Sequence, residues 1–412
     1  MKLSAVRPPR LRTTETEAGD ERSATWMELF YDLVFVVAVA ALAKRLLADP
    51  GWGGVLAFTG LFVPIWWSWA SYTFYADRYD TDDAIQRVLV IVQIAAIALM
   101  AASISGDTAD SSVGFALSYV LARLVLLVMY VRAQRHVVET RELVSGYLKG
   151  FSAGGLVWLV SVFVPEPARF WMWGVALLIE FATPYAVRKL QARSPLSVSH
   201  LPERFGLFTI LVLGESIAAV VAGLAHEGWV GQSVAAALLG VFLASGLWWL
   251  YFDNAEGSVV RRDPKTAKAW RPTVWIFTHL PLSGALVASG IGLEFMVALH
   301  AGTVERFVVA GGTAGALAFM GVLHIATEPS PERRDSTKAM VRFGAALVAL
   351  LLGAVIGENA VALVVALLVL IVGQILLDLL ILDHALPTEM PSDPVEAADS
   401  DEQAEPVDTS EG

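Results

Sequence analysis

Glu28-Leu29-Phe30 opens the first long apolar segment of this 412-residue chain, and Glu203-Arg204-Phe205 opens another one 175 residues later (203 − 28). The likeness continues further along each half, where Gln93 to Gly106 runs parallel to His279 to Gly292. We interpret these matches as a tandem duplication of one membrane unit.

The composition is that of a membrane protein. Hydrophobic residues make up 56% of the chain and charged residues 17%. Apolar runs of about 18 residues or more, long enough to cross roughly 30 Å of hydrocarbon, recur throughout. They are continuous rather than alternating, and backbone groups in lipid must be paired within the segment, so helices are expected. The sequence therefore predicts an all-α, polytopic membrane helix bundle with about 12 transmembrane helices, at about 28–47, 54–75, 86–105, 113–131, 147–164, 169–187, 205–224, 232–252, 273–293, 305–325, 340–356 and 360–382.

The distribution of basic residues predicts how the bundle is oriented in the membrane. With the N-terminus inside, all but five of the 29 Lys and Arg fall in the tail and loops on the inner side. The outer loops hold Lys44, Arg45, Arg169 and Arg306, and Arg123 is the one basic residue placed inside a span. This asymmetry follows the positive-inside rule. We expect a multi-pass protein of the bacterial inner membrane with both termini cytoplasmic.

Six spans in each half give both repeats one orientation, so the halves are predicted to be parallel repeats related by an axis along the membrane normal. The predicted units are an N-terminal tail (1–25), a first six-helix repeat (26–190), a cytoplasmic linker (191–202), a second repeat (203–386) and an acidic tail (387–412). The last contains nine of the 40 acidic residues and no Lys or Arg, a composition typical of disorder.

Several kinds of chemistry lack sequence support. The chain has no Cys, which removes thiol catalysis and Cys-ligated metals. No zinc spacing, phosphate-binding Gly-rich loop or Ser-His-Asp pattern is found. We therefore predict no catalytic residues, no metal, no cofactor and no nucleic-acid partner, and we expect membrane lipids and a small ion or small molecule as partners.

Three ionisable residues are predicted near the middle of the bilayer, where a charge is costly and needs a partner or a purpose. Glu215 lies ten residues past Phe205, and Arg123 and Glu180 are at similar depth in their own spans. Arg123 can neutralise one carboxylate, and the other must be protonated or find another partner. The sequence leaves open which Glu is paired, and also whether the group is an ion pathway or a structural bridge.

Four further polar residues are candidates for a pathway. Glu28 and Asp32 share one face of the first helix near its cytoplasmic end, either as an acidic mouth or as helix-capping acids. His279 lies in the ninth span, at the position matching Gln93 in the third. His279 is either a proton relay or a hydrogen-bonded packing residue.

Three motifs resemble one family. The segment from Trp26 to Val36, the segment from His200 to Ser216 and the segment from Thr278 to Leu282 are similar to motifs of the bacterial low-temperature-requirement A (LtrA) membrane proteins. The resemblance covers roughly residues 22–383. It implies a bacterial multispanning inner-membrane protein linked to growth in the cold, and it implies no defined catalytic site.

Two functions of different classes are consistent with these observations. The first is a secondary transporter or ion-permeation protein with a polar site at the membrane midplane between the repeats, as transporters with internal repeats commonly have. Glu215 would then be the protonatable or cation-binding acid and Arg123 a counter-charge or anion contact. The alternative is a non-transporting sensor or scaffold that responds to the state of the bilayer in the cold. A third class, an intramembrane enzyme acting on lipid, has only His279 and Glu215 to support it.

Overall fold

The computed structural model describes residues 7–11, 25–105, 111–193, 200–253, 270–327 and 334–382. These residues are almost entirely helical. The helices are α1 (Trp26–Ala48), α2 (Trp52–Arg78), α3 (Ala84–Ser105), α4 (Ser111–His136), α5 (Arg141–Ser161), α6 (Ala168–Ala186), α7 (Arg188–Gln191), α8 (His200–Glu227), α9 (Gly231–Phe252), α10 (Arg271–Val297), α11 (Thr303–Thr327), α12 (Arg334–Val355), α13 (Ala360–Leu377) and the π-helical turn η1 (Asp378–Leu382). Two short strands, β1 (Arg10–Leu11) and β2 (Tyr79–Asp80), pair antiparallel.

Eleven of the helices in the described part of the chain are long and apolar enough to cross a membrane. The predicted twelfth span, 169–187, also forms a helix, α6, but α6 is not among the eleven. Arg169, Glu180 and Pro184 lower the hydropathy of this 19-residue helix. Eleven of the predicted spans are therefore confirmed as long apolar helices, and α6, at the position of the remaining one, is shorter and more polar.

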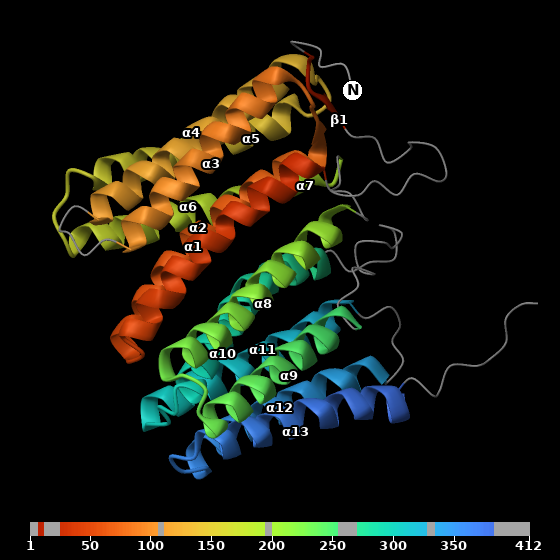
Figure 1. The fold of residues 1–412 in the computed structure, drawn as a ribbon. Helices are drawn as coiled ribbons and strands as arrows, with labels where there is room; N and C mark the ends of the chain where they lie inside the picture. Colours follow the sequence, from red (N-terminus) through yellow and green to blue (C-terminus); the bar gives the residue numbers. More distant parts are fainter. Residues whose placement is uncertain are drawn as a thin grey trace, which may run out of the picture.

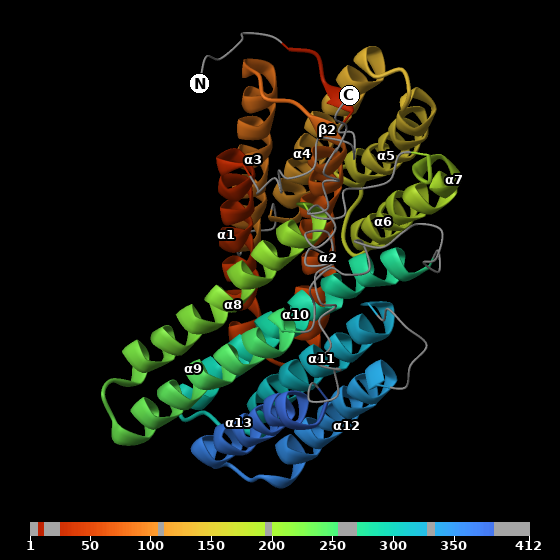
Figure 2. The ribbon, with the colours of Figure 1, turned by 90° about the vertical axis from the view of Figure 1, so that its right-hand side faces the viewer.

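The helices form two groups that meet along α1 and α8. In Figure 1, α1–α7 occupy the upper part of the molecule and α8–α13 the lower part. Turned by 90°, the helices of the lower group are inclined to those of the upper group (Figure 2). Contacts between the groups come from α1 and α2 on one side and from α8 and α10 on the other.

The order of packing is similar within the two groups. In the first, α1 packs on α3, α3 on α4, α4 on α5 and α5 on α6. In the second, α8 packs on α10, α10 on α11 and α11 on α12, and α13 returns to α9. Polar side chains within the helices are therefore buried either among the helices of their own group or at the boundary with the other group.

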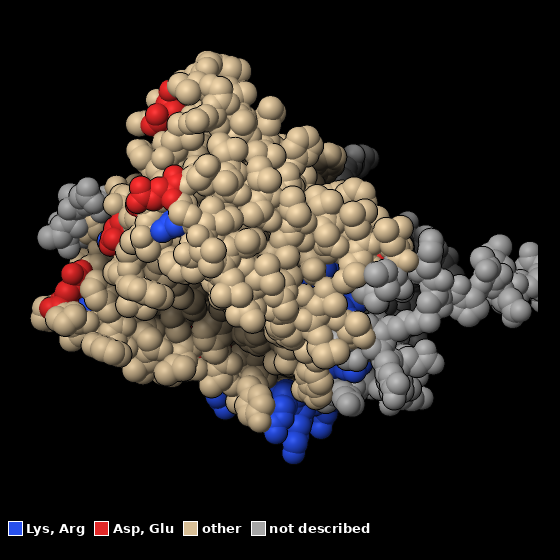
Figure 3. All heavy atoms as spheres, turned by 90° about the horizontal axis from the view of Figure 1, so that it is seen from below, with Lys and Arg blue, Asp and Glu red and all other residues tan. Residues whose placement is uncertain are grey.

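Charged side chains gather at the two ends of the bundle. Figure 3 shows Asp and Glu along one side of this face, and most Lys and Arg away from them, at the lower middle and toward the opposite side, with a broad uncharged surface between. Many large hydrophobic residues of the described helices are exposed, such as Leu56, Leu178 and Val369. We call the end at which α1 and α8 begin the basic end, and the opposite end the acidic end.

Glycines let α8, α10 and α11 approach closely. A Cβ placed on Gly290 would lie 2.5 Å from the Ser216 hydroxyl oxygen on α8, and one on Gly312 would lie 2.3 Å from the Ser289 backbone nitrogen. Small residues at such crossings are the usual means of close helix packing in membranes. They hold these three helices of the second group together as one block.

Candidate functional site

An ion pair joins the two helix groups near the basic end. Arg204 on α8 donates from Nε to one oxygen of Asp32 on α1 at 3.0 Å and from Nη2 to the other at 2.6 Å. The indole of Trp69 on α2 donates to Asp32 at 2.8 Å. All three side chains are buried. A two-point, charge-assisted pair of this kind is among the stronger and more directional polar contacts in proteins.

Glu28 and His200 extend this ion pair. The His200 ring lies 3.4 Å from a Glu28 carboxylate oxygen and 3.1 Å from a carboxylate oxygen of Asp77 on α2. Glu28 also lies 3.5 Å from Arg204 and accepts from the backbone and hydroxyl of Thr25 at 2.8 and 2.9 Å, which forms a capping box at the start of α1. We call Glu28, Asp32, Trp69, Asp77, His200 and Arg204 the seam cluster.

Helical spacing explains why these residues meet. Glu28 and Asp32 are four residues apart on α1, and His200 and Arg204 are four apart on α8, so each pair occupies one face of its helix. The third helix, α2, presents Trp69 and Asp77 at an eight-residue separation on one face. Three carboxylates thus face one guanidinium and one imidazole, and the net charge of this group changes when the imidazole gains or loses a proton.

A second buried ionic group lies within the first helix group. Arg123 on α4 contacts Glu180 on α6 at 2.5 Å, and both side chains are almost fully buried. Tyr119 and Trp67 donate to the same carboxylate oxygen at 2.5 and 2.9 Å. The guanidinium also lies over the rings of Tyr119 and Phe151, at 5.2 and 5.0 Å. We call Trp67, Tyr119, Arg123 and Glu180 the α4–α6 cluster.

The α4–α6 cluster is tightly packed and contains polar atoms without hydrogen-bond partners. A Cβ on Gly154 of α5 would lie 2.5 Å from the Glu180 side chain, so only glycine leaves room for the carboxylate there. Among the described residues, Nε and Nη1 of Arg123 and Oε1 of Glu180 have no hydrogen-bond partner. Buried polar atoms of native proteins are rarely left in that state, which distinguishes this cluster from the apolar packing around it.

Comparison with known proteins agrees with the helical membrane architecture. The family described as bacterial low temperature requirement A protein (LtrA) matches residues 23–373. The chain belongs to the LtrA family. It is also 29% identical over 303 residues to a Rhizobium meliloti (strain 1021) protein named "Uncharacterized protein RA0937", covering 68% of this chain and 71% of that one. With its apolar helices, this LtrA-family chain is an integral, multi-pass membrane protein.

The predicted midplane residues do not all meet in this LtrA-family protein. Arg123 and Glu180 pair with each other inside the first helix group. Glu215 is on α8 in the second group, half-buried, where the nearby charges acting on it include Lys44 of α1. The open question of which Glu pairs with Arg123 is thus answered in favour of Glu180.

The remaining predicted residues are all buried. Glu28 and Asp32 are part of the seam cluster rather than the lining of an open mouth. His279 on α10 lies 3.0 Å from the Tyr251 hydroxyl and 2.7 Å from the Trp275 carbonyl oxygen, and its ring is stacked edge-on against Phe205. Gln93 is buried on α3, and its side-chain oxygen has no partner among the described residues.

Buried arginines were missed by the sequence analysis. Arg123 is not the one basic residue inside a span, because Arg204 in α8 and Arg342 in α12 are also fully buried, and Arg78 at the end of α2 is buried too. Arg342 donates to Gln374 at 2.7 Å and pairs with Asp378. Both were counted with the inner loops, because Arg204 immediately precedes the predicted span 205–224 and Arg342 is the third residue of the predicted span 340–356. The signal for Arg204 was its four-residue spacing from His200 at the head of a long apolar run.

Proposed function

We propose that this LtrA-family protein is a secondary transporter of a small ion or small polar solute, with its pathway between two parallel six-helix repeats, α1–α6 and α8–α13. The observation that carries the proposal is the seam cluster, in which charged residues of α1, α2 and α8 are buried against one another at the boundary between the helix groups. Transporters with internal repeats commonly place their polar sites at that boundary.

The free-energy cost of burying charged side chains supports a functional role for the seam cluster. A buried ion pair gains little net stability over apolar packing, because both charges lose their hydration. Trp66 and Phe205 pack beside the cluster, so apolar contact between the groups is already provided. Five ionisable groups held at this boundary suit a protein that changes charge or partners there during its cycle.

The order of packing supports the repeats. The α1–α3–α4–α5 series in the first group corresponds to α8–α10–α11–α12 in the second, in agreement with the sequence matches. We further propose that the membrane is the bacterial inner membrane, that the basic end is cytoplasmic as the positive-inside rule requires, and that lipids cover the uncharged surface. Glu215 remains the proposed midplane acid, and Arg123 with its partner Glu180, His279 and Gln93 are further pathway candidates.

A flux assay tests the proposal. Purified protein is reconstituted in liposomes loaded with a pH-sensitive dye, and gradients of protons, K⁺, Na⁺ or acetate are imposed in turn. We expect flux above protein-free liposomes for at least one gradient, reduced at least tenfold in Asp32→Asn and in Glu215→Gln. The conservative Arg193→Lys variant, in an exposed ion pair with Glu142, is the matched control and keeps wild-type flux.

Flux equal to that of protein-free liposomes under every gradient would overturn the transporter proposal. The sensor or scaffold alternative then becomes the better interpretation. It predicts a cold-growth defect after removal of the acidic tail, residues 387–412, which lie outside the described part of the chain.

A further inference from the structure

A pocket of about 400 Å³ lies at the acidic end of the first helix group, where α1 ends, α2 begins and α3 ends. Its volume is within the range of about 300–1,000 Å³ that is usual for small-molecule sites. Its charged wall residues are Lys44 and Arg45 of α1 and Asp49 of the turn that follows α1. The other walls consist mostly of small residues: Ala41, Ala48, Gly54 and Ala57. We call it the α1–α3 pocket.

The α1–α3 pocket lies at the depth of lipid headgroups. Helix α1 has 23 residues, which at 1.5 Å per residue span about 35 Å, so its last turn reaches beyond a hydrocarbon layer of roughly 30 Å. Trp52, the first residue of α2, is 84% exposed, two positions before Gly54 of the pocket wall. Exposed tryptophans are typical of the membrane–water interface. A ligand in this pocket would therefore contact both water and the edge of the hydrocarbon.

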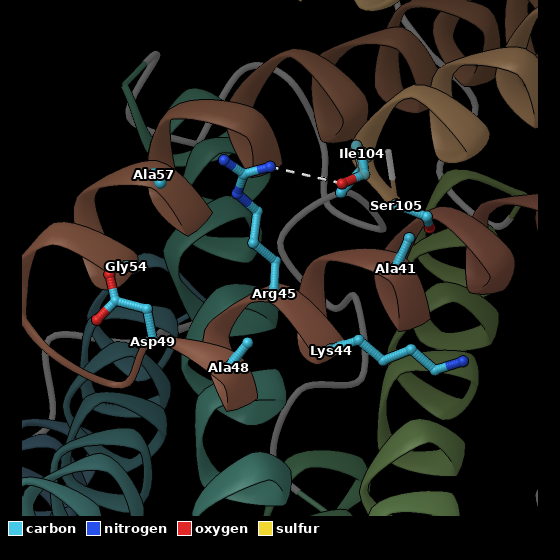
Figure 4. Close-up of a pocket in the computed structure, with 9 residues that line it drawn as sticks. All are labelled: Ala41, Lys44, Arg45, Ala48, Asp49, Gly54, Ala57, Ile104 and Ser105. Atoms are coloured by element: carbon cyan, nitrogen blue, oxygen red, sulfur yellow. Dashed lines mark hydrogen bonds between the residues drawn. The ribbon is translucent and has the colours of Figure 1, made fainter. Parts of the chain in front are cut away.

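The opposite charges of the pocket are held apart. Arg45 and Asp49 are four residues apart, a spacing at which ion pairs form readily on a helix, yet within the described ranges no ion pair of 4.0 Å or less joins them. Figure 4 shows the Arg45 side chain directed toward Ile104 of α3, whose carbonyl oxygen accepts from it at 3.5 Å, while Lys44 leaves α1 in another direction. The Asp49 carboxylate accepts instead from the backbone N–H of Gly51 at 3.1 Å. The pocket thus presents cations and a carboxylate separately, and all three side chains are exposed.

Two other arginines at the acidic end are already bound to neighbouring helix ends. Arg169 at the start of α6 is buried and donates to carbonyl oxygens near the end of α5 at 3.1 and 3.2 Å. Arg306 at the start of α11 is also buried and donates to a carbonyl oxygen just after α12. Arg45, in contrast, makes one long hydrogen bond with its five N–H groups, so most of its donors are available to a ligand.

An apolar stripe runs from the pocket toward the middle of the bilayer. Leu33 and Val37 precede Ala41 of the pocket wall at four-residue intervals, so all three lie on one face of α1. The side chains of Leu33 and Val37 are 52% and 58% exposed. Acyl chains covering this face would continue directly from a headgroup held in the pocket. A soluble anion would use only the polar wall, so the stripe favours a lipid as the ligand.

We infer that the α1–α3 pocket binds the headgroup of a phospholipid that carries both a phosphate and a primary ammonium, as phosphatidylethanolamine does. Lys44 and Arg45 bind the phosphate, because basic pockets between transmembrane helices suit phosphorylated headgroups. The Asp49 carboxylate accepts from the ammonium, whereas a purely anionic headgroup would leave Asp49 facing like charge. This lipid site does not depend on the proposed transport function.

Lipid titration followed by native mass spectrometry tests the site. The full-length protein is freed of lipid in detergent, and dioleoyl-phosphatidylethanolamine or dioleoyl-phosphatidylglycerol is added, with inorganic phosphate as a competitor. We expect the first phosphatidylethanolamine to bind about fivefold more tightly than phosphatidylglycerol, and Arg45→Gln to weaken it about fivefold, the usual contribution of one cation. Asp49→Asn keeps an acceptor for the Gly51 N–H and should remove the preference for phosphatidylethanolamine.

Two matched controls separate the pocket from general effects of charge and size. Lys189→Gln removes an exposed charge on α7, at the basic end, and should leave lipid binding unchanged. Ala57→Leu fills the pocket without changing its charge and should weaken binding. Ala102→Leu, at an exposed position of α3 outside the pocket, should not.

Three outcomes would overturn the inference. Equal lipid binding in Arg45→Gln and Lys189→Gln would show that the pocket is not the site. Tighter binding of phosphatidylglycerol would assign an anionic lipid instead, and displacement of the lipid by inorganic phosphate would assign a soluble anion. Circular dichroism establishes that each variant is folded, and the comparison of Ala57→Leu with Ala102→Leu decides the matter if Arg45→Gln is not.

Discussion

Arg204 of α8 binds both carboxylate oxygens of Asp32 of α1, and this pair is the most direct polar link between the two helix groups. The two residues are 172 positions apart in the sequence. Because both are buried, removing one charge leaves the other without compensation in an apolar boundary. The relative placement of the groups should therefore depend strongly on each partner.

Replacing Arg204 with Gln should destabilise the protein by about 3–5 kcal/mol, the usual result of breaking one side of a buried ion pair. The free energy of unfolding is measured by SDS titration in mixed micelles. The control is Arg193→Gln, which removes an exposed pair with Glu142 and should cost at most about 1 kcal/mol. Similar losses of unfolding free energy in the two variants would show that the buried Asp32–Arg204 pair stabilises the protein no more than an exposed pair does.

Substitutions of Arg123 and Glu180 should have non-additive effects on the free energy of unfolding. Glu180→Gln or Arg123→Met alone should each cost about 3–5 kcal/mol, because a buried charge loses its partner. The double variant should be less destabilised than the sum, since the uncompensated charge is gone. The measurement is a double-mutant cycle on unfolding free energy, and a coupling below about 0.5 kcal/mol would contradict the close contact of the pair.

Glycine 154 should be required for the α4–α6 cluster. Gly154→Ala places a methyl group 2.5 Å from the Glu180 side chain, so the carboxylate must move away from Tyr119 and Trp67. We expect a loss of about 1–3 kcal/mol from overpacking. Gly174→Ala, in the exposed face of α6 with nothing within 4 Å, is the control and should be neutral or stabilising by up to about 1 kcal/mol. Equal effects of the two substitutions would mean that the space beside Glu180 is not limiting.

Sequence reasoning located the membrane helices and most of their buried acids. Hydropathy is a property of each segment by itself, so eleven apolar helices could be predicted from the chain, and Arg123 and Glu180 are buried within helices at these segments.

The side chains that each buried charged residue contacts could not be predicted. The sequence gives neither the neighbours of a helix nor its rotation about its own axis. Arg204 looked like an interfacial residue because it lies in the second turn of α8, yet it is fully buried by α1 and α2. Glu215 shared a predicted depth with Arg123 but lies in the other helix group. Similar depth along two helices does not by itself bring their side chains into contact.

The segment Arg7–Leu11 should be released from the basic end by acid. Its strand β1 pairs with β2, and the backbone N–H of Arg7 donates to buried Asp83 at 2.9 Å. Burial alone would raise the pKa of Asp83, but hydrogen bonds from Arg132 and from the backbone of Arg7 and Gln86 outweigh it and hold this pKa below its ordinary value of 3.8. A carboxyl with a lowered folded-state pKa stabilises the folded form above about pH 4, and that contribution is lost as the pH falls through the lowered value.

Asp83→Asn should therefore loosen the segment already at neutral pH, by about 1–3 kcal/mol for the lost charged hydrogen bonds, and should flatten the pH dependence below pH 4. Hydrogen exchange of residues 7–11 followed by mass spectrometry gives the readout. Asp82→Asn is the control, because Asp82 makes an exposed pair with Arg87. If the wild-type segment is equally protected from exchange at pH 7 and pH 3, Asp83 does not hold it in place. The β1–β2 pairing and the contact of Arg132 with the Arg7 carbonyl oxygen, at 2.6 Å, would then be sufficient.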